Sequence, residues 1–274
     1  MKPKWVIEDF EPDNKFDELA KEVRAHGMEC EVIKYFPMES GSYDVFPGEQ
    51  CVLFQGSLQL AKQLHREKQW VPGVWLDKKN YDCSVYYAHY GKYLFNDEYI
   101  MMPVGEIMRR KDYIFEAYGK ENSVFIRPNS GFKSFTGQVF NYETFDKDFW
   151  LIKDFSEPDD IAVISNPKNV LNEWRFIVSG KEVITGSYYK KGGKKDYSSD
   201  YPIQAEDKVK EILREIEWRP DPMFVIDICQ AADNNFYLME INSFSCAGLY
   251  GCDMQKIVET ASELAVKEWQ ELNK

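Results

Sequence analysis

The chain has 274 residues, of which 44% are hydrophobic and 29% are charged. This is the composition of a globular protein, and it excludes a disordered, collagen-like or coiled-coil chain. Lys and Arg number 34 and Asp and Glu 46, so the formal net charge is −12. A surface this acidic repels nucleic acid and anionic membranes, so neither is an expected partner. A small anion such as a nucleotide remains compatible with it, because a few convergent cations set the local field.

Cysteine and histidine usage narrows the chemistry further. The six cysteines show no CxxC pair and no regular spacing, which indicates a reduced, cytoplasmic protein without a zinc site. The start of the chain has no apolar stretch and no run near 18 apolar residues follows, so neither a secretory signal nor a membrane span is expected. The three histidines, His26, His65 and His89, all lie in the first third. Catalysis by a nucleophile, a histidine and an acid within the last two thirds is therefore excluded, unless the N-terminal part supplies the base.

The first hundred residues alternate between strand and helix patterns. Apolar, β-prone runs and segments with helical spacing follow one another before a change of texture near residue 104. The expected strands are 5–10, 30–36, 51–55 and 74–76, and the expected helices are 16–25 and 58–69. Alternation of this kind predicts a small parallel sheet covered by helices.

The remainder of the chain has antiparallel hairpins and isolated helices. Hairpins are expected at 124–140, 174–189 and 224–241, a short buried strand at 161–164, and helices at 105–118, 145–155, 207–216 and 254–272. Residues 190–201 (KKGGKKDYSSDY) are polar and carry two glycines, which predicts a mobile loop. The four lysines of this loop either cover an anion or form a solvated basic loop.

The most specific signal lies in FVIDICQAADNNFYLMEINSF, residues 224–244. A two-residue or four-residue turn near Asp233 sets Asp227 opposite Glu240, with Asn242 on the same face, whereas a three-residue loop breaks that register. Two opposed carboxylates repel unless a cation lies between them, and two carboxylates with an amide oxygen suit Mg²⁺. The alternative is a hairpin whose acids point to solvent, but its flanking residues are too apolar for a surface ribbon.

Two further segments place cations beside small or acidic residues. In FIRPNSGFKSFTG, Arg127 lies on a strand and Lys133 in a loop of Gly, Ser and Thr, which would let backbone N–H groups and a point charge approach phosphate. An ordinary hairpin loop with exposed cations is the alternative. In NEWRFIVSG, Glu173 and Arg175 share one strand face, either as binding residues or as members of ion pairs.

The order of these pieces resembles the ATP-grasp superfamily. A strand with a basic residue, a loop lysine, a short apolar strand, an acid-x-Arg strand, a later basic residue and Asp…Glu-x-Asn follow one another as in that superfamily. Glu173-Trp174-Arg175 is similar to the acid-x-Arg strand of the tubulin-tyrosine-ligase-like and ribosomal-protein-modifying branches. The phrases FIRP…KSFTG and EWRF are most similar to a clade of small ATP-grasp proteins from phages and bacteria. The resemblance covers roughly residues 105–274.

The resemblance implies an α/β chain that is α+β in its C-terminal part. Two α+β subdomains would clasp ATP, preceded by a small βαβ domain that helps to bind the acceptor. The expected domains are 1–104 (N-terminal), 105–164 (small ATP-grasp subdomain) and 165–274 (large subdomain with the Mg²⁺ site).

By the same resemblance, ATP and Mg²⁺ are the expected cofactors. The phosphates would be held by Arg127 and Lys133, although many relatives use two lysines. The adenine edge would meet backbone groups of Ala162, Val163 and Ile164, and the ribose or adenine would meet Glu173. The γ-phosphate or the acceptor carboxylate would face Arg175 and Lys190, and the metal would be held by Asp227, Glu240 and Asn242.

The implied activity is ligation of a carboxylate to an amine, on small-molecule or peptide substrates, through an acylphosphate with release of ADP and phosphate. Catalysis would depend on alignment and charge neutralisation, with no protein nucleophile. Residues 190–201 are the expected lid, and residues 243–251 are expected to border the acceptor. Cys246 in that stretch has no accompanying base, which argues against a thiol nucleophile.

Three other functions are compatible with parts of the pattern. ATP-grasp phosphoryl transfer to a hydroxyl or a histidine would share the nucleotide site. A nucleotide-binding module without turnover would tolerate loss of the metal ligands, which this chain keeps. A glycosidase using Asp227 and Glu240 as acid and base is disfavoured by Asn242 and by the loop lysines.

Overall fold

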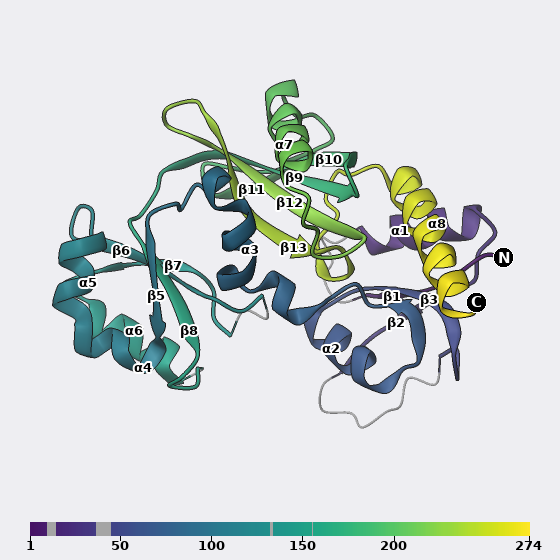
Figure 1. Cartoon of the computed structure of the whole chain (residues 1–274), viewed down its shortest axis with the longest axis horizontal. Helices are drawn as coiled ribbons and strands as arrows, with labels where there is room; N and C mark the ends of the chain where they lie inside the picture. Colours follow the sequence, from purple (N-terminus) through teal and green to yellow (C-terminus); the bar gives the residue numbers. More distant parts are fainter. Residues whose placement is uncertain (10–14, 37–44, 132–133, 155) are drawn as a thin grey trace. The chain divides into compact units, whose positions relative to one another are not determined.

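The computed structural model describes residues 1–9, 15–36, 45–131, 134–154 and 156–274. The chain forms two compact units, and each draws on more than one segment (Figure 1). Unit 1 contains Met1–Leu76, Asn172–Ile228 and Glu240–Lys274, and unit 2 contains Asp77–Leu171 and Cys229–Met239. No helix among the described residues is both long and apolar enough to span a membrane.

Unit 1 begins with a four-stranded parallel sheet, which confirms the sheet expected for the N-terminal part, although its fourth strand is Trp70–Gly73 and not the expected 74–76. Its strands have the order β2-β1-β3-β4, and every neighbouring pair is parallel. The strands are β1 (Lys4–Glu8), β2 (Cys30–Ile33), β3 (Gln50–Gln55) and β4 (Trp70–Gly73), and the helices between them are α1 (Phe16–Ala25) and α2 (Leu58–Glu67). The Ser57 side chain accepts a hydrogen bond from the Leu60 amide and caps α2.

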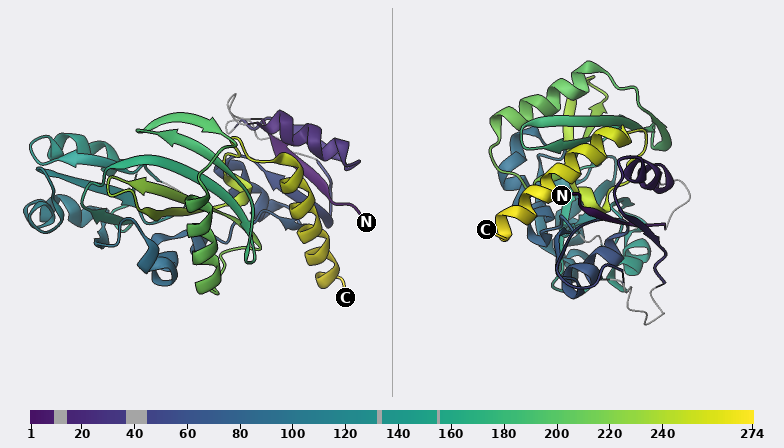
Figure 2. Two further views of the ribbon diagram at one scale, coloured as in Figure 1. Left: turned by 90° about the horizontal axis from the view of Figure 1, so that it is seen from above. Right: turned by 90° about the vertical axis from the view of Figure 1, so that its right-hand side faces the viewer.

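The last helix, α8 (Met254–Leu272), has the predicted bounds and packs beside α1 (Figures 1 and 2). Asp253 caps its first turn by accepting from the Lys256 amide. Its apolar side, including Ile257 and Val258, belongs to the same buried cluster as Trp5 of β1. The N-terminal sheet is therefore covered by a helix from the opposite end of the chain.

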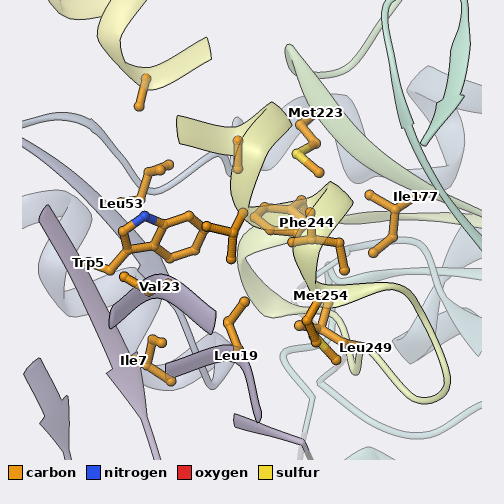
Figure 3. Close-up of a cluster of buried hydrophobic side chains, with 14 of the residues drawn as sticks. Trp5, Ile7, Leu19, Val23, Leu53, Ile177, Met223, Phe244, Leu249 and Met254 are labelled. Atoms are coloured by element: carbon orange, nitrogen blue, oxygen red, sulfur yellow. The ribbon is translucent and has the colours of Figure 1, made fainter. Parts of the chain in front are cut away.

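Phe244 is a central member of that cluster. Figure 3 shows its ring among side chains from β1 and β3 (Trp5, Leu53) and from β9 and β12 (Ile177, Met223). The Phe244 side chain is fully buried, and Phe244 follows the strand that carries Glu240 and Asn242. Apolar burial of this size is worth about 1.5–3 kcal/mol for a large side chain, so it anchors the segment that positions those polar residues.

The second sheet has the strand order β11-β10-β9-β12-β13. Its strands are β9 (Val170–Ser179), β10 (Glu182–Lys191), β11 (Lys194–Ser198), β12 (Met223–Ala231) and β13 (Phe236–Ser243), with α7 (Ile203–Glu215) between β11 and β12 and a 3-10 turn, η4 (Phe244–Cys246), after β13. The hairpins expected at 174–189 and 224–241 are both present.

The prediction of a mobile loop at residues 190–201 is wrong. Strand β10 continues to Lys191, and β11 returns antiparallel with Lys190 opposite Lys195 and Lys191 opposite Lys194. Gly192 and Gly193 both have positive φ angles, 52° and 79°, as a two-residue turn of type I′ requires. The two glycines therefore make a tight turn, and we call residues 190–198 the lysine hairpin.

The β12–β13 hairpin closes through a three-residue loop rather than the predicted two or four residues. The Ala231 amide donates to the Asn235 carbonyl, the Asn234 amide donates to the Ala231 carbonyl, and Asn234 has φ = 64°. A regular ladder from this turn would put Asp227 and Glu240 on opposite faces. The side-chain hydrogen bonds of Asn242 nevertheless join both carboxylates.

Unit 2 is built on an antiparallel sheet with the strand order β5-β8-β6-β7. Its strands are β5 (Tyr99–Pro103), β6 (Ser123–Pro128), β7 (Gln138–Asn141) and β8 (Ile161–Ser165). The expected division near residue 104 assigned 99–103 to the N-terminal part, but these residues form β5, which pairs with β8 in the sheet of unit 2. The sequence does not reveal this assignment, because β5 pairs with a strand about sixty residues later in the chain.

Helices and short turns complete unit 2. They are η1 (Lys78–Tyr81), α3 (Cys83–Tyr90), η2 (Gly91–Tyr93), α4 (Val104–Ile107), η3 (Met108–Arg110), α5 (Lys111–Tyr118) and α6 (Phe145–Asp154). The helix expected at 105–118 is interrupted by the 3-10 turn η3. The cluster around Ile114, Phe140 and Phe149 forms the core of this unit.

Candidate active site

A buried ion pair between Arg175 and Asp227 lies at the centre of the candidate site. Arg175 is on β9 and Asp227 on β12, which are neighbours in the sheet. The Arg175 Nε donates to Asp227 Oδ1 at 2.9 Å, and Nη2 donates to Oδ2 at 2.7 Å. The exposed fractions are 7% for Arg175 and 0% for Asp227. This fork-to-fork geometry is the strongest arrangement that an arginine and a carboxylate adopt.

Asn242 joins this pair to the second predicted carboxylate. Its Nδ2 donates to Asp227 Oδ2 at 3.1 Å and to Glu240 Oε1 at 3.1 Å. The three predicted metal-ligating side chains therefore lie together on one face, as the sequence predicts. The guanidinium of Arg175 supplies the positive charge that two neighbouring carboxylates need.

Glu173 lies two residues before Arg175 and has two partners from β10. The Tyr189 hydroxyl donates to Glu173 Oε2 at 2.6 Å, and Lys190 Nζ lies 3.2 Å from Oε1. The side chain of Glu173 is only 10% exposed, and that of Lys190 is 37% exposed. Both members of the acid-x-Arg motif thus form ion pairs, and the partner of Glu173 is the predicted site residue Lys190.

Two tyrosine rings lie against Arg175. The rings of Tyr189 and Tyr250 are stacked, with centroids 5.1 Å apart and planes at 9°. The Cζ atom of Arg175 is 5.3 Å from the first centroid and 5.1 Å from the second. Its Nη1 also donates to the Gly248 carbonyl at 3.1 Å. The guanidinium is therefore held by a carboxylate, a carbonyl and two aromatic rings.

The electrostatics of this cluster follow from burial and from the carboxylates. Burial alone would lower the pKa of Arg175, but the Asp227 carboxylate beside it raises that pKa well above its ordinary value. Burial, reinforced by the charges of Asp227 and Glu173, raises the pKa of Tyr189 well above its ordinary value. At neutral pH the arginine is therefore charged and the tyrosine is a neutral hydrogen-bond donor.

The donor set of Asp227, Glu240 and Asn242 fits a hard divalent cation. It offers two carboxylates and an amide from adjacent strands, which are oxygen ligands of the kind that Mg²⁺ prefers. Only two of the three are acids, and in the described part of the chain no group of three or more His, Cys, Asp or Glu side chains is arranged around a metal position. To present oxygen to a cation, the Asn242 amide has to turn and Asp227 has to share an oxygen with Arg175.

The other predicted nucleotide-binding residues belong to unit 2. Arg127 on β6 is directly opposite Val163 on β8, so the predicted cation and the predicted adenine-binding strand are neighbours. Lys133 lies outside the described residues. The backbone of Ala162, Val163 and Ile164 pairs with β5 on one side and β6 on the other, so these groups already have partners within the sheet.

Buried polar atoms without partners follow at the end of β8. The Oγ of Ser165 and the Oδ1 of Asn166 are buried and have no hydrogen-bond partner among the described residues. The same is true of the Oδ1 of Asn96. Ser165 is 1% exposed. Asn166 lines a hollow of about 650 Å³ with Tyr99 and Tyr118. Buried polar atoms of this kind indicate a missing partner such as a ligand or water.

Sequence reasoning missed four of these residues, namely Tyr189, Tyr250, Ser165 and Asn166. Tyr250 lies within the stretch 243–251 that was expected to border the acceptor, and Ser165 directly follows the predicted strand at 161–164. Their neighbours in the sequence were therefore a usable signal. The contacts themselves depend on which strands are adjacent, which the sequence does not state.

Cys246 has the properties of an unreactive thiol. Burial raises its pKa to about 12, so almost no thiolate exists at neutral pH. The sequence-based argument against a thiol nucleophile therefore agrees with the environment of this side chain.

A parallel sheet with helices, followed by two antiparallel sheets, is the ATP-grasp fold. The chain matches the family model described as ATP-grasp domain, R2K clade family 2, over residues 108–260. The match spans more than half of the chain. The protein therefore belongs to this family of the R2K clade.

Solved structures support the same fold at low sequence identity. D-cycloserine synthetase DcsG has a TM-score of 0.65 at 10% identity, covering 95% of this chain and 99% of that one. The ATP-grasp ligase PsnB complexed with minimal precursor has 0.55 at 12%, covering 97% and 100%. D-alanine–D-alanine ligase from Bacillus anthracis has 0.56 at 12%, covering 99% and 98%. No curated protein sequence matches the chain significantly.

Proposed function

We propose that this protein is an ATP-dependent carboxylate–amine ligase that acts through an acylphosphate and releases ADP and phosphate. Members of the ATP-grasp family are mostly ligases of this kind. The observation that carries the proposal is the arrangement of Arg175, Asp227, Asn242 and Glu240 on one face of the second sheet. It unites a divalent-metal donor set with a guanidinium that suits a phosphoryl group.

The cofactors of the proposed reaction are ATP and Mg²⁺. Asp227, Glu240 and Asn242 would hold the cation, which when bound neutralises the charge of the triphosphate. Arg127 and Lys133 would contact the phosphates, and Glu173 would accept hydrogen bonds from the ribose hydroxyls. Glu173 retains this capacity, because a carboxylate has about four acceptor sites and Tyr189 and Lys190 use one each.

The adenine edge was expected at the backbone of Ala162, Val163 and Ile164. Because those backbone groups pair within the sheet, we place the polar contact of the base one or two residues further on. The side-chain oxygens of Ser165 and Asn166 are buried and without partners among the described residues. Both would accept from the adenine amino group, and the Ser165 hydroxyl would also be able to donate to a ring nitrogen.

In the proposed mechanism, a carboxylate oxygen of the first substrate attacks the γ-phosphorus of ATP. A new O–P bond forms, the bond to the bridging oxygen of ADP breaks, and an acylphosphate results. The amine nitrogen of the second substrate then attacks the acyl carbon, the C–N bond forms, phosphate leaves and the nitrogen loses a proton. Arg175 and Lys190 would orient and neutralise the transferred phosphoryl group, so that no protein nucleophile is needed.

The substrates would be a carboxylate and an amine, either small molecules or peptides. PsnB is described as complexed with a minimal precursor, and DcsG as a D-cycloserine synthetase, so the fold serves substrates of different size. The lysine hairpin would shield the reacting groups from water. It would take the role of lid that the sequence assigned to a loop.

A coupled assay tests the proposal directly. Purified protein with Mg²⁺ and ATP is supplied with pooled amino acids and peptides, and the nucleotide product and the mass of the joined product are measured. We expect ADP and phosphate, with product formation dependent on both a carboxylate and an amine. Formation of AMP would refute the acylphosphate route, and a stable phosphorylated product without an amine would favour phosphoryl transfer.

Glu240→Gln should abolish turnover while the protein stays folded, because it removes a carboxylate from the metal donor set. The matched control is Glu182→Gln, an exposed residue on β10, which should keep wild-type turnover. A Glu240→Gln variant that retains turnover would show that the metal site is elsewhere.

A further inference from the structure

We propose that Tyr250, with Tyr189, is a positioning residue that holds the guanidinium of Arg175 for phosphoryl transfer. The catalytic part of this inference rests on the proposed function, whereas the holding contact does not. Both rings lie within 5.3 Å of the Arg175 Cζ atom and stack on each other at 9°. A guanidinium beside two stacked rings has little freedom to rotate, and cation–π attraction to the rings is strongest when the group is desolvated, as Arg175 is.

Arg175 needs such a support because its carboxylate partner has a second task. In the structure both oxygens of Asp227 accept from Arg175. A cation bound by Asp227 would have to share at least one of these oxygens with Arg175, which weakens the hold of the carboxylate on the guanidinium. The contacts that do not change are the Gly248 carbonyl and the rings of Tyr189 and Tyr250. These contacts keep the guanidinium N–H groups near the position of the transferred phosphoryl group.

The residues that follow Tyr250 are tied to strands β10 and β11. The Gly251 amide donates to the Ser187 Oγ at 2.9 Å, and the Asp253 amide donates to the Thr185 Oγ1 at 2.9 Å. A Cβ atom at Gly251 would lie only 2.7 Å from the Ser198 carbonyl carbon, so this residue lies directly against the backbone after β11. The loop therefore holds the Tyr250 ring in one place relative to β10.

The backbone of Tyr250 itself is strained. Its φ angle is +46°, a conformation that glycine or asparagine adopts at lower cost and that is uncommon for an aromatic residue. A tyrosine at this position loses stability that a glycine would recover. The ring contacts with Arg175 and Tyr189 give a reason for keeping the side chain despite that loss.

Tyr189 extends the support to the nucleotide side of the site. Its hydroxyl donates to Glu173 at 2.6 Å, and its ring stacks on Tyr250. The two tyrosines thus connect the residue proposed for the ribose with the guanidinium proposed for the γ-phosphate. Displacement of the Tyr250 ring should therefore disturb Arg175 first and nucleotide binding less.

Nitrogen-15 NMR of the arginine side chains tests the contact without any turnover. The Nε–Hε signal of Arg175 is assigned by its disappearance in Arg175→Lys, and is then followed in Tyr250→Phe, Tyr250→Ala and the control Tyr197→Ala. Tyr197 contacts Tyr250, with centroids 5.8 Å apart, whereas the rings beside Arg175 are those of Tyr189 and Tyr250. Alanine has the same difficulty as tyrosine with a positive φ, so the comparison isolates the ring.

We expect the Arg175 signal to keep its shift in Tyr250→Phe and Tyr197→Ala, and to move or broaden in Tyr250→Ala. In the ligase assay Tyr250→Ala should lower kcat about 100-fold with the KM for ATP changed less than about threefold, as expected for misplacement of a reacting partner. Tyr250→Phe should restore kcat to within about threefold of wild type.

An Arg175 signal unchanged in Tyr250→Ala would overturn the proposal, whatever the enzyme catalyses. An equal loss of kcat in Tyr250→Phe and Tyr250→Ala would also overturn it, because the hydroxyl and not the ring would then matter. If the signal responds as expected but no ATP-dependent ligation occurs with any substrate, the support of Arg175 stands and the proposed function fails.

Discussion

The polar groups of the second sheet and those at the end of β8 differ in one respect, which is whether the described protein satisfies them. Around Arg175 and Asp227 every named polar side chain has a hydrogen-bond partner. At the end of β8, Ser165 and Asn166 carry buried oxygens without a partner in the part of the chain that the structure describes. The first region is organised before any ligand binds, and the second has capacity left for a ligand.

This difference agrees with the two tasks of the proposed reaction, which are phosphoryl transfer and recognition of the base. Phosphoryl transfer depends on charges held in fixed positions, and the cluster around Arg175 has them. Recognition of a base depends on donors and acceptors that are free until the ligand arrives, and the end of β8 has these. Substitutions around Arg175 should therefore change mainly the folding stability. Substitutions at the end of β8 should change mainly the affinity for the nucleotide.

The largest expected effect is that of Asp227→Ala. It leaves the guanidinium of Arg175 buried without its carboxylate, so we expect the free energy of unfolding to fall by about 3–5 kcal/mol. Urea unfolding followed by circular dichroism measures it. The double variant Asp227→Leu with Arg175→Met removes both charges and should regain most of the loss. A single variant within about 1 kcal/mol of wild type would show that the ion pair has little effect on folding.

A smaller effect, on ATP affinity and not on stability, is expected for Ser165→Ala. The hydroxyl has no partner among the described residues, so its removal should leave the unfolding free energy within about 0.5 kcal/mol of wild type. If the base binds there, the affinity for ATP measured by calorimetry should fall about fivefold, the value of one neutral hydrogen bond. Unchanged ATP affinity would remove Ser165 from the nucleotide site and weaken the contrast between the two regions.

The smallest effect concerns the surface contact between α1 and α8. The ring nitrogens of His26 lie 3.3 Å from the Glu22 carboxylate and 3.4 Å from the Glu259 carboxylate. Lys2 Nζ donates a hydrogen bond to the backbone carbonyl of His26. The hydrogen bond to the Glu22 carbonyl, with the two carboxylates, raises the pKa of His26 above its ordinary value. A raised folded-state pKa means that the stabilisation is complete below the unfolded pKa of about 6.5 and is lost as pH rises through the folded pKa.

The urea midpoint of wild type should therefore exceed that of His26→Gln at about pH 5.5, and the two should converge as the pH rises to about 8.5. The difference should shrink in high salt, because the charges are close to solvent. A constant difference over this range would assign the contact to packing rather than to charge.

Sequence patterns predicted the elements whose stabilisation is local. Helix α8 was predicted to the residue, because its apolar periodicity is regular and Asp253 caps it. Helix α3 was missed because the buried residues of its inner face are mainly its three tyrosines, Tyr86, Tyr87 and Tyr90, whose hydroxyl groups weaken the apolar pattern. The lysine hairpin was missed because Gly-Gly between lysines is also typical of a loop, and only the positive φ angles distinguish the tight turn.

The candidate site was predicted in its composition more than in its contacts. Strand alternation with a two-residue or four-residue turn predicted that Asp227, Glu240 and Asn242 share a face. Their side chains are joined by hydrogen bonds, but the turn has the three residues that were expected to break this register. The ion pair of Arg175 with Asp227 joins residues 52 positions apart, and the sequence does not state that β9 and β12 are neighbours. The support of Arg175 by Tyr250 depends on that same adjacency and could not be predicted.

The N-terminal sheet shares its core with α8, and this has a consequence for biosynthesis. On a ribosome the first 76 residues emerge long before Ile257, Val258 and Ala261, which fill the same buried cluster. At about 5–20 residues per second, the apolar side of β1 and β3 is covered by α1 alone for roughly ten seconds or more. Chaperones that shield nascent chains therefore have a defined target here, and a fragment that ends before α8 should aggregate.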